Sequence, residues 1–384
     1  MRVPGRDGVH LTYCSNIHPG ESWAQTRHNL ETHVPVVRQR LGVAGPFGIG
    51  LRLSAAAADE LASTPGELER LRTALDDAGL YVFTINGFPY GPFHGTSVKE
   101  QVYRPDWREP ERVRYTTQLI DILERLLPEG VPGSISTVPA YFRARHEEGA
   151  PEAVARALRA HAIDLDRRRS ARGVDIALAL EPEPCCVLET IEETVAFFET
   201  HLFASATDEG ALRRHIGVCL DTCHAAVEYE DPAACVGALL GAGIRLAKAQ
   251  LTTGLRLAPA SPEALQALRA YSDEVYLHQV VVRDAAGTLT RYVDLPDALA
   301  DASAARDEWR VHYHVPVFEH HLGPFTNTQP FLEQTLRELL ARDATPHLEV
   351  ETYTWDVLPP ELRGDDVDDA IARELRWVLD HACR

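Results

Sequence analysis

Eight short apolar runs recur along the chain, and polar loops and helical stretches separate them. The runs begin near residues 11 (LTYCSN), 48 (GIGLRLS), 81 (YVFTING), 133 (GSISTVP), 175 (DIALALEPE), 216 (IGVCLDTCH), 244 (IRLAKAQL) and 347 (HLEVETYTW). Strands that alternate with helices in this way pair in parallel, because each helix carries the chain back across the sheet. Eight such units predict an α/β fold, the (β/α)8 or TIM barrel. A doubly wound sheet is the alternative, but no glycine-rich dinucleotide fingerprint follows any of the runs.

The segment between the seventh and eighth runs is too long for one helix. Within it, YLHQVVVRDAAGTLTRYVDL predicts a β-hairpin, and WRVHYHVPVF alternates as a strand does, with His312 and His314 on one face. TQPFLEQTLRELLARD then predicts a helix, and DDVDDAIARELRWVLDHACR predicts a last helix on the barrel wall. We therefore expect one domain over residues 1–384, with a lid-like insertion at 258–320 between strands seven and eight.

Charge and apolar patterning exclude several classes of protein. The chain has 38 Lys and Arg against 57 Asp and Glu, so its formal net charge is −19, which repels nucleic-acid phosphates. No run of 18 apolar residues occurs, so we expect no membrane insertion. The opening MRVPGRDGVHLTYCSN lacks an apolar signal core, which predicts a cytoplasmic protein, and the seven cysteines are expected to be free thiols.

Polar residues gather at the carboxyl ends of the later strands, where the active site of such a barrel lies. Alternate positions on strands five to eight give Ala177, Ala179, Glu181 and Glu183, then Gly217, Cys219, Asp221 and nearby His224, then Lys248 and Gln250, then Glu349 and Glu351. Carboxylates that point toward one position repel each other, which predicts that a divalent cation binds between them and neutralises their charge. These oxygen-rich ligands suit Mn²⁺, Mg²⁺ or Co²⁺, and Zn²⁺ if His224 takes part. Alternatively, Lys248 pairs with Glu181 or Glu351.

Earlier loops supply candidate substrate contacts. Asn16 and His18 follow the first strand and Asn86 follows the third, so all three can reach the mouth of the barrel. The alternative is that Asn16 caps a loop, His18 lies on the surface, and the residues around Asn86 only shape their loop.

Three segments resemble the xylose-isomerase-like TIM-barrel superfamily, which includes sugar phosphate isomerases and epimerases. They are EPEP at 181–184, LDTCH at 220–224 and EVET at 349–352. Over nearly the whole chain, HLTYCSNIHPGESW, NGFPYGPFHG and ETYTWDVLP are similar to the EboE-type metabolite traffic proteins. This closer resemblance implies a role in moving a secondary-metabolite precursor, together with proteins of the same gene cluster.

The resemblance also implies residue roles. Glu181, Asp221 and Glu351 match metal ligands, and Gln250 occupies a position where the superfamily usually has histidine, which weakens the expectation of tight zinc binding. His314 or His278 from the insertion can compensate. Glu181 and Glu351 would move a proton next to a carbonyl, with His224 and Lys248 completing the catalytic set. From their positions after the strands and in the insertion, rather than from the resemblance, Asn16, His18, Asn86 and His314 are expected to bind substrate.

Two functions follow from these patterns. The first is a metal-dependent isomerase or epimerase of a small polyhydroxylated or keto metabolite. The second is a metabolite-binding protein without turnover that passes its ligand to a partner. A nuclease is not expected, because strands two and three end in Leu53-Ser54 and Ile85-Asn86 rather than in metal-binding histidines.

Overall fold

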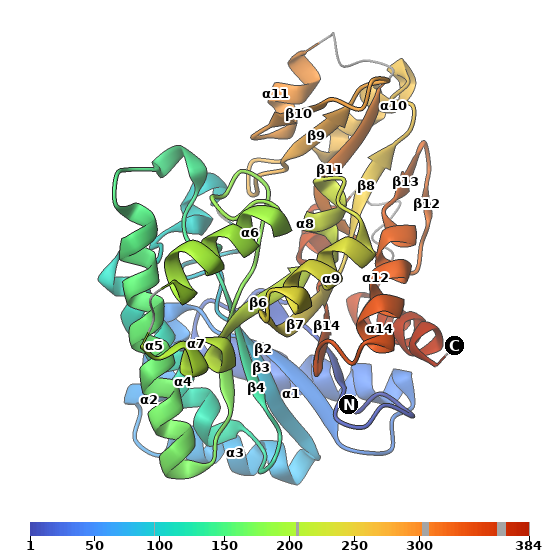
Figure 1. The fold of residues 1–384 in the computed structure, drawn as a ribbon. Helices are drawn as coiled ribbons and strands as arrows, with labels where there is room; N and C mark the ends of the chain where they lie inside the picture. The colour runs from blue at the N-terminus through green and yellow to red at the C-terminus, as the bar shows by residue number, and fades with distance from the viewer. Residues whose placement is uncertain (96, 205–206, 302–306, 359–365, 384) are drawn as a thin grey trace.

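Eight parallel strands form the central sheet of the computed structural model, which describes residues 1–95, 97–204, 207–301, 307–358 and 366–383 (Figure 1). The strands are β1 (His10–Tyr13), β2 (Phe47–Arg52), β3 (Leu80–Asn86), β4 (Gly133–Thr137), β5 (Ile176–Leu180), β6 (Ile216–Asp221), β7 (Arg245–Leu251) and β14 (His347–Val350). Their order is β1-β14-β7-β6-β5-β4-β3-β2, and a parallel bridge between Cys14 and Gly50 joins the two ends. The predicted barrel is therefore confirmed, and all eight predicted runs are its strands.

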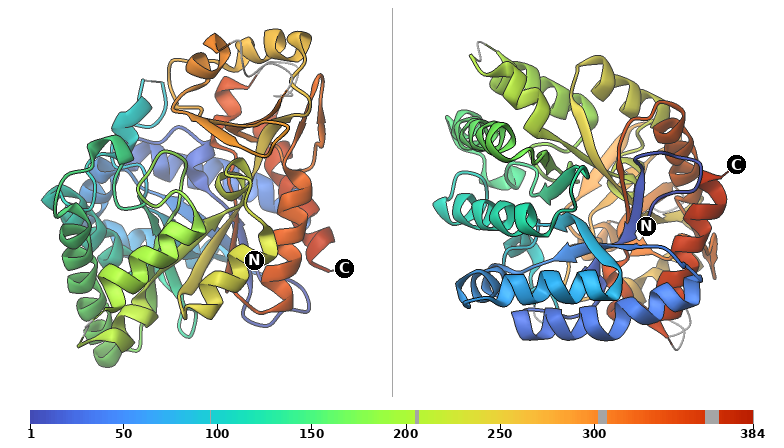
Figure 2. Two further views of the ribbon diagram at one scale, coloured as in Figure 1. Left: turned by 45° about the horizontal axis from the view of Figure 1, so that its top comes forward. Right: turned by 90° about the horizontal axis from the view of Figure 1, so that it is seen from below.

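Helices surround this sheet, as the view from below shows (Figure 2). The longer ones are α1 (Trp23–Leu41), α3 (Glu67–Ala78), α4 (Pro110–Leu126), α5 (Ala150–Arg172), α9 (Pro232–Gly241), α12 (Gln329–Ala341) and α14 (Val367–Ala382). Shorter ones are α2 (Ala55–Ser63), α6 (Ile191–Phe197), α7 (Glu209–His215) and α8 (Thr222–Val227). The stretch from 54 to 79 forms two helices rather than one, because Pro65 and Gly66 interrupt it, Gly66 with a positive φ of 74°.

The barrel interior changes from small residues to polar ones along the strands. Ala177, Ala179, Cys219 and Ala247 form a small buried cluster. Such small side chains leave space inside the barrel for the long side chains of Lys248 and Glu349, both fully buried. The carboxylates predicted for the site follow at the carboxyl ends of the strands.

A second sheet lies between β7 and β14 in the sequence. It contains β8 (Thr253–Leu257), β9 (Val280–Arg283), β10 (Leu289–Tyr292), β11 (Glu308–Val315), β12 (His321–Leu322) and β13 (Phe325–Asn327), with α10 (Pro262–Leu268) and α11 (Leu295–Ala300). The strands pair antiparallel in the order β10-β9-β11-β8-β13-β12. The predicted hairpin is β9–β10, and the alternating WRVHYHV segment forms β11. Residues 302–306 of the expected insertion lie outside the described ones.

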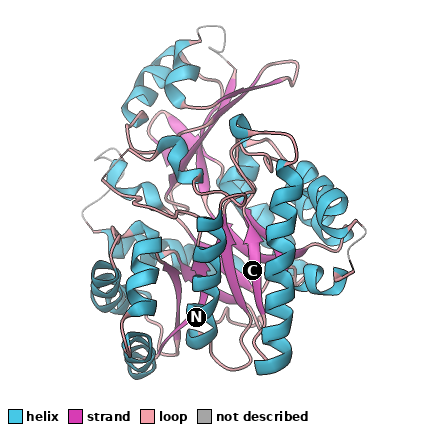
Figure 3. Ribbon diagram, turned by 90° about the vertical axis from the view of Figure 1, so that its left-hand side faces the viewer, coloured by secondary structure: helices cyan, strands magenta, loops and turns pink. Residues whose placement is uncertain are grey.

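This inserted sheet packs against one end of the barrel, above α8 and β6 in Figure 1 and above the barrel strands in Figure 3. Gly254 allows the close approach, because a Cβ there would lie 2.9 Å from Cys223 Sγ on α8 and 2.9 Å from the Val311 carbonyl oxygen on β11. Cys223, Val227 and Val281 form a buried apolar cluster across the same contact. The second sheet is thus held beside the carboxyl ends of β6 and β7.

Within the described ranges, we find no helix with the length and apolarity needed to cross a membrane.

Candidate active site and metal centre

Three buried carboxylates meet at the carboxyl ends of β5, β6 and β14. Glu181 directly follows β5, Asp221 is the last residue of β6, and Glu351 directly follows β14. Their exposed fractions are 3%, 1% and 4%, and a carboxylate oxygen from each lies within 4.8 Å of the other two. The geometry therefore brings together the three carboxylates that the sequence predicted as metal ligands.

The environment of these carboxylates favours protons or a cation. Burial raises the pKa of Glu181 well above its ordinary value, and the neighbouring Glu351 and Asp221 raise it further. Burial and Asp221 likewise raise the pKa of Glu351 to about 8. Within the described part of the chain, Glu181 Oε2 and Asp221 Oδ2 have no hydrogen-bond partner. Buried oxygens without a partner are costly, so this is a natural position for a metal ion.

Asp221 is held rigidly by its other oxygen. Asp221 Oδ1 accepts hydrogen bonds from the backbone N–H of Cys223 (2.7 Å) and of His224 (3.0 Å) and from Thr252 Oγ1 (2.6 Å). Asp221 is also the N-cap of α8, so the helix begins directly after the last residue of β6. The capping role fixes Oδ1, and only Oδ2 remains available for a ligand.

Two asparagines hold Glu351 in the same way. Asn16 Nδ2 donates to Glu351 Oε1 at 2.7 Å, and Asn86 Nδ2 donates to the same oxygen at 2.8 Å. Asn16 and Asn86 were predicted to contact substrate. Both line the pocket described below, and both also orient this carboxylate.

Lys248, Gln250 and Glu349 lie inside the barrel. Lys248 Nζ is 3.1 Å from Glu349 Oε2, and both side chains are completely buried. The ion-pair partner of Lys248 is therefore Glu349. Gln250 lies in register with Asp221 on one side and Glu349 on the other, and neither atom of its amide has a hydrogen-bond partner among the residues described.

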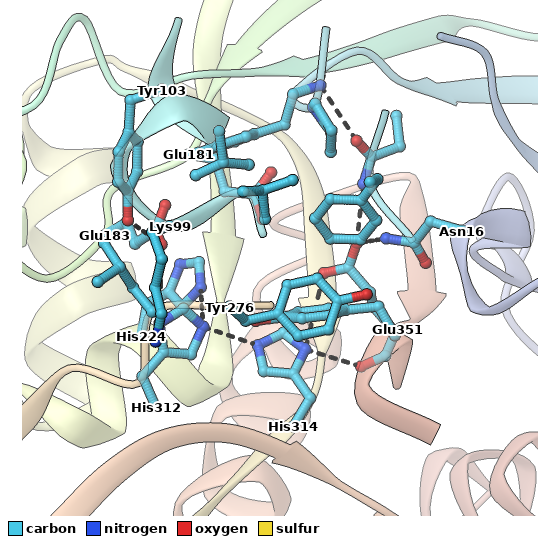
Figure 4. A pocket seen from close by; sticks show the side chains of 18 residues that line it. Asn16, Lys99, Tyr103, Glu181, Glu183, His224, Tyr276, His312, His314 and Glu351 are labelled. Atoms are coloured by element: carbon cyan, nitrogen blue, oxygen red, sulfur yellow. Dashed lines mark hydrogen bonds and ion pairs between the residues drawn. The ribbon is translucent and has the colours of Figure 1, made fainter. Parts of the chain in front are cut away.

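Three histidines converge on one another (Figure 4), and two of them, His224 and His314, lie beside Asp221. His224 comes from α8, and His312 and His314 come from one face of β11. The distance from Nε2 of His312 to Nε2 of His224 is 3.1 Å, and to Nε2 of His314 it is 3.2 Å. Burial lowers the pKa of His312 well below its ordinary value and that of His314 to about 4, so these two rings are neutral at physiological pH. His312 was not among the predicted site residues, although the alternation along its segment places it on the same face as His314.

One pocket is lined by Glu181, Glu351 and the three histidines. Its polar lining includes Asn16, Asn86, Lys99, Tyr103, Glu181, Glu183, His224, His312, His314 and Glu351. The rest is apolar or aromatic: Phe88, Pro89, Phe93, Val98, Val102, Tyr276, Leu277 and Tyr353. Lys99, Tyr103 and Tyr276 had no signal in the sequence, because they follow no strand that the pattern could place at the mouth. Tyr353 could have been found, because it lies two residues after Glu351 in the eighth run.

His18 occupies a different place. It does not line this pocket, and its ring stacks on His33 with 4.0 Å between ring centroids. His33 Nδ1 is in turn 2.8 Å from Asp368 Oδ1 on α14. His18 therefore contacts the surrounding helices, whereas Asn16, two residues earlier, reaches the pocket.

Comparisons with known proteins bear on the fold. No protein-family model matches the chain, and no curated protein sequence matches it. The solved structure of the IOLI protein with a binding zinc atom is similar, with a TM-score of 0.50, 14% identity, and 97% of this chain and 98% of that chain covered. The probable 3-DHS dehydratase AsbF from Bacillus anthracis is also similar, with a TM-score of 0.47, 13% identity, and 96% and 98% covered. The chain therefore shares its fold with the IOLI protein.

Proposed function

We propose that this protein is a divalent-metal-dependent isomerase or epimerase of a small polyhydroxylated or keto metabolite. The observation that carries the proposal is the convergence of the buried and partly unpartnered carboxylates Glu181, Asp221 and Glu351, of which Glu181 and Glu351 line a pocket with aromatic walls. Burying such charges costs free energy unless a cation or ligand pairs with them, so buried carboxylates of this kind indicate a binding or catalytic site.

The residues present fit a metal ion. Glu181, Asp221, Gln250 and Glu351 would hold it, and buried oxygens of Glu181, Asp221 and Gln250 are free for it within the described structure. An all-oxygen set of this kind suits Mn²⁺, Mg²⁺ or Co²⁺ better than Zn²⁺. A bound divalent ion polarises a carbonyl oxygen and stabilises negative charge that develops on it.

The two glutamates then carry the proton. One carboxylate removes the proton from the carbon next to the substrate carbonyl. The other returns a proton to the opposite face of that carbon in an epimerase, or to the former carbonyl carbon in an isomerase, where the hydroxyl proton also passes between the two oxygens. A raised pKa suits both groups to this exchange near neutral pH, as found for Glu351 at about 8. Asn16 and Asn86 hold Glu351 in one orientation, and Lys248 keeps Glu349 neutralised inside the barrel. We propose that His224 and His314, which line the pocket, contact the bound substrate.

The pocket favours a metabolite without phosphate. Among the lining residues described, Lys99 carries the fixed positive charge, and its Nζ is already bound 2.7 Å from Asp294 Oδ2 and 2.9 Å from the Asp273 carbonyl oxygen. Phe88, Phe93 and Tyr276 offer faces on which a ring can stack. A cyclic, hydroxylated and uncharged molecule matches these walls. The resemblance to metabolite traffic proteins supports a place in a secondary-metabolite pathway, with partner proteins of the same gene cluster.

Metal content and proton exchange test this proposal together. We expect protein purified without nickel affinity to hold about one equivalent of Mn, Mg, Co or Zn in the carboxylate site, and the Glu181→Gln/Asp221→Asn variant to lose it. With uncharged keto sugars and cyclitols in D2O, NMR should show enzyme-dependent exchange of the proton next to the carbonyl. We expect Glu181→Gln and Glu351→Gln each to slow it at least ~100-fold, the usual scale of acid–base catalysis.

Glu374→Gln is the matched control, because Glu374 is as deeply buried but lies on α14 outside the pocket. It should keep both the metal and the exchange. Exchange that survives in Glu181→Gln would contradict the proposal. Ligand-dependent thermal stabilisation without any proton exchange would instead support the second candidate, a binding protein without turnover, which the same pocket allows.

A further inference from the structure

We propose that His224, His312 and His314 form a second, nitrogen-rich metal site, with Asp221 Oδ2 as its fourth ligand. Its chemistry fits Zn²⁺ or a similar transition-metal ion, unlike the all-oxygen site formed by the carboxylates. The two sites share Asp221, but this inference does not depend on the isomerase reaction.

The hydrogen bonds of the three rings fix their tautomers. His224 Nδ1 lies 2.9 Å from the Pro182 carbonyl oxygen, and His314 Nδ1 lies 3.0 Å from the Glu351 carbonyl oxygen. A carbonyl oxygen only accepts hydrogen bonds, so each Nδ1 must carry the proton. In a neutral ring the Nε2 atom is then a bare lone pair. Both lone pairs point toward His312.

His312 has the same tautomer, because the amide of Gln279 is held in one orientation. Gln279 Nε2 donates to the Pro184 carbonyl oxygen at 3.2 Å and to Tyr103 Oη at 2.7 Å. Its Oε1 must therefore be the atom that faces His312 Nδ1 at 2.7 Å, and it accepts the proton there. The third Nε2 is also a bare lone pair.

The lone pair on His312 Nε2 faces that of His224 at 3.1 Å and that of His314 at 3.2 Å, and such lone pairs repel unless a cation lies between them. In a tetrahedral zinc site with Zn–N distances of about 2.0–2.1 Å, neighbouring ligand atoms are about 3.3 Å apart. The observed separations are close to that value. Asp221 Oδ2 lies 4.0 Å from His224 Nε2 and 3.9 Å from His314 Nε2, near enough to complete the set with a small shift.

The surroundings also have the form of a metal site. Metal-bound histidines nearly always donate their other ring N–H to a carbonyl or carboxylate oxygen, which orients the ring. All three rings here do so. They are at least 95% buried, with exposed fractions of 5%, 3% and 1%, and all three line the pocket. An ion held there would therefore border the space where substrate binds.

X-ray absorption and zinc binding test the proposal on the full chain. After removal of metal with a chelator and dialysis against zinc, the wild-type absorption spectrum should show about three imidazole ligands on the histidine-bound ion. His312→Gln and His314→Gln should each weaken zinc binding at least ~100-fold, because loss of an outer partner alone weakens it 10–100-fold. Gln279→Leu should weaken it ~10–100-fold without removing a ligand. His321→Gln, an exposed histidine on β12 of the same sheet, should change nothing.

The outcomes separate this site from the proposed reaction. Glu181→Gln should keep the histidine-bound zinc even though proton exchange is lost, and retained exchange in that variant would count against the reaction alone. A zinc shell of oxygen ligands only, or zinc binding unchanged in both His312→Gln and His314→Gln, would overturn the histidine site. Failure of the wild type to bind zinc at all would overturn it too, and would mean that a shared proton joins the three rings.

Discussion

The ion pair of Lys248 and Glu349 is a charged contact enclosed entirely by the barrel. Lys248 was expected among the catalytic residues, and Glu349 raises its pKa against the opposing effect of burial, so it stays charged. Replacing Lys248 with Met leaves Glu349 buried without a counter-charge. We expect Lys248→Met to lower the free energy of unfolding by about 3–5 kcal/mol.

Urea unfolding followed by circular dichroism measures this loss, and Lys248→Met/Glu349→Leu is the matched double variant. The double variant should recover most of the stability, because well-packed apolar residues often replace a buried ion pair at little cost. A single variant as stable as the wild type would show that Glu349 does not need Lys248.

At the same scale, the sequence predicts the carboxylates better than their partners. Glu181, Asp221 and Glu351 were predictable because the ends of parallel strands share one edge of the sheet. The partner of Lys248 was not, since it depends on the register between β7 and β14, which no local pattern encodes. The fixed tautomer of His312 depends on Gln279, 33 residues away along the chain, and on the Tyr103 and Pro184 oxygens.

At the scale of the secondary-structure elements, helix α14 carries a buried glutamate, Glu374, that makes the free energy of unfolding depend on pH. Burial raises the pKa of Glu374 from 4.5 to about 7, although its carboxylate accepts hydrogen bonds from Thr352 Oγ1 and the Val317 N–H. The folded state thus keeps a proton that the unfolded state has released. The stabilisation is complete below pH 4.5 and is lost as the pH rises through about 7.

Thermal or urea unfolding of the wild type and Glu374→Gln at pH 5 and pH 8 checks this. We expect the variant to be more stable relative to the wild type at pH 8 than at pH 5 by up to about 3 kcal/mol, since each pKa unit is worth about 1.4 kcal/mol. Parallel curves for the two proteins would show that Glu374 does not titrate in this range.

The elements of the barrel were more predictable than those of the inserted sheet. Each barrel strand is a clear apolar run, and β11 was evident from its alternation. No such pattern marks β12 and β13, which have two and three residues. β13 lies beside β8 through tertiary pairing of Thr326 with Arg256 and of Asn327 with Leu255, and β12 pairs with β13. Short strands of this kind depend on contacts between residues far apart in the chain.

At the scale of the whole molecule, the site lies where two sheets meet. Asp221 and His224 belong to the barrel, and His312 and His314 belong to the inserted sheet. An ion bound to all four would link the sheets, in addition to the apolar contact of Cys223, Val227 and Val281. Neither sheet alone contains the full set of ligands. We therefore expect metal binding to stabilise the junction of the two sheets.

Removing zinc with a chelator tests whether the bound ion stabilises the junction of the two sheets. A ligand present at 100 times its Kd stabilises the folded state by about 2.7 kcal/mol, so removing zinc should lower Tm by several degrees. Limited proteolysis of the metal-free protein should cut within residues 253–327 sooner than in the zinc-bound protein, because the sheet has lost its link to the barrel. His312→Gln should behave like the metal-free protein with or without zinc, whereas His321→Gln should behave like the wild type. If zinc raises Tm equally in His312→Gln and in the wild type, the ion does not join the two sheets, and its stabilising contacts must lie within the barrel.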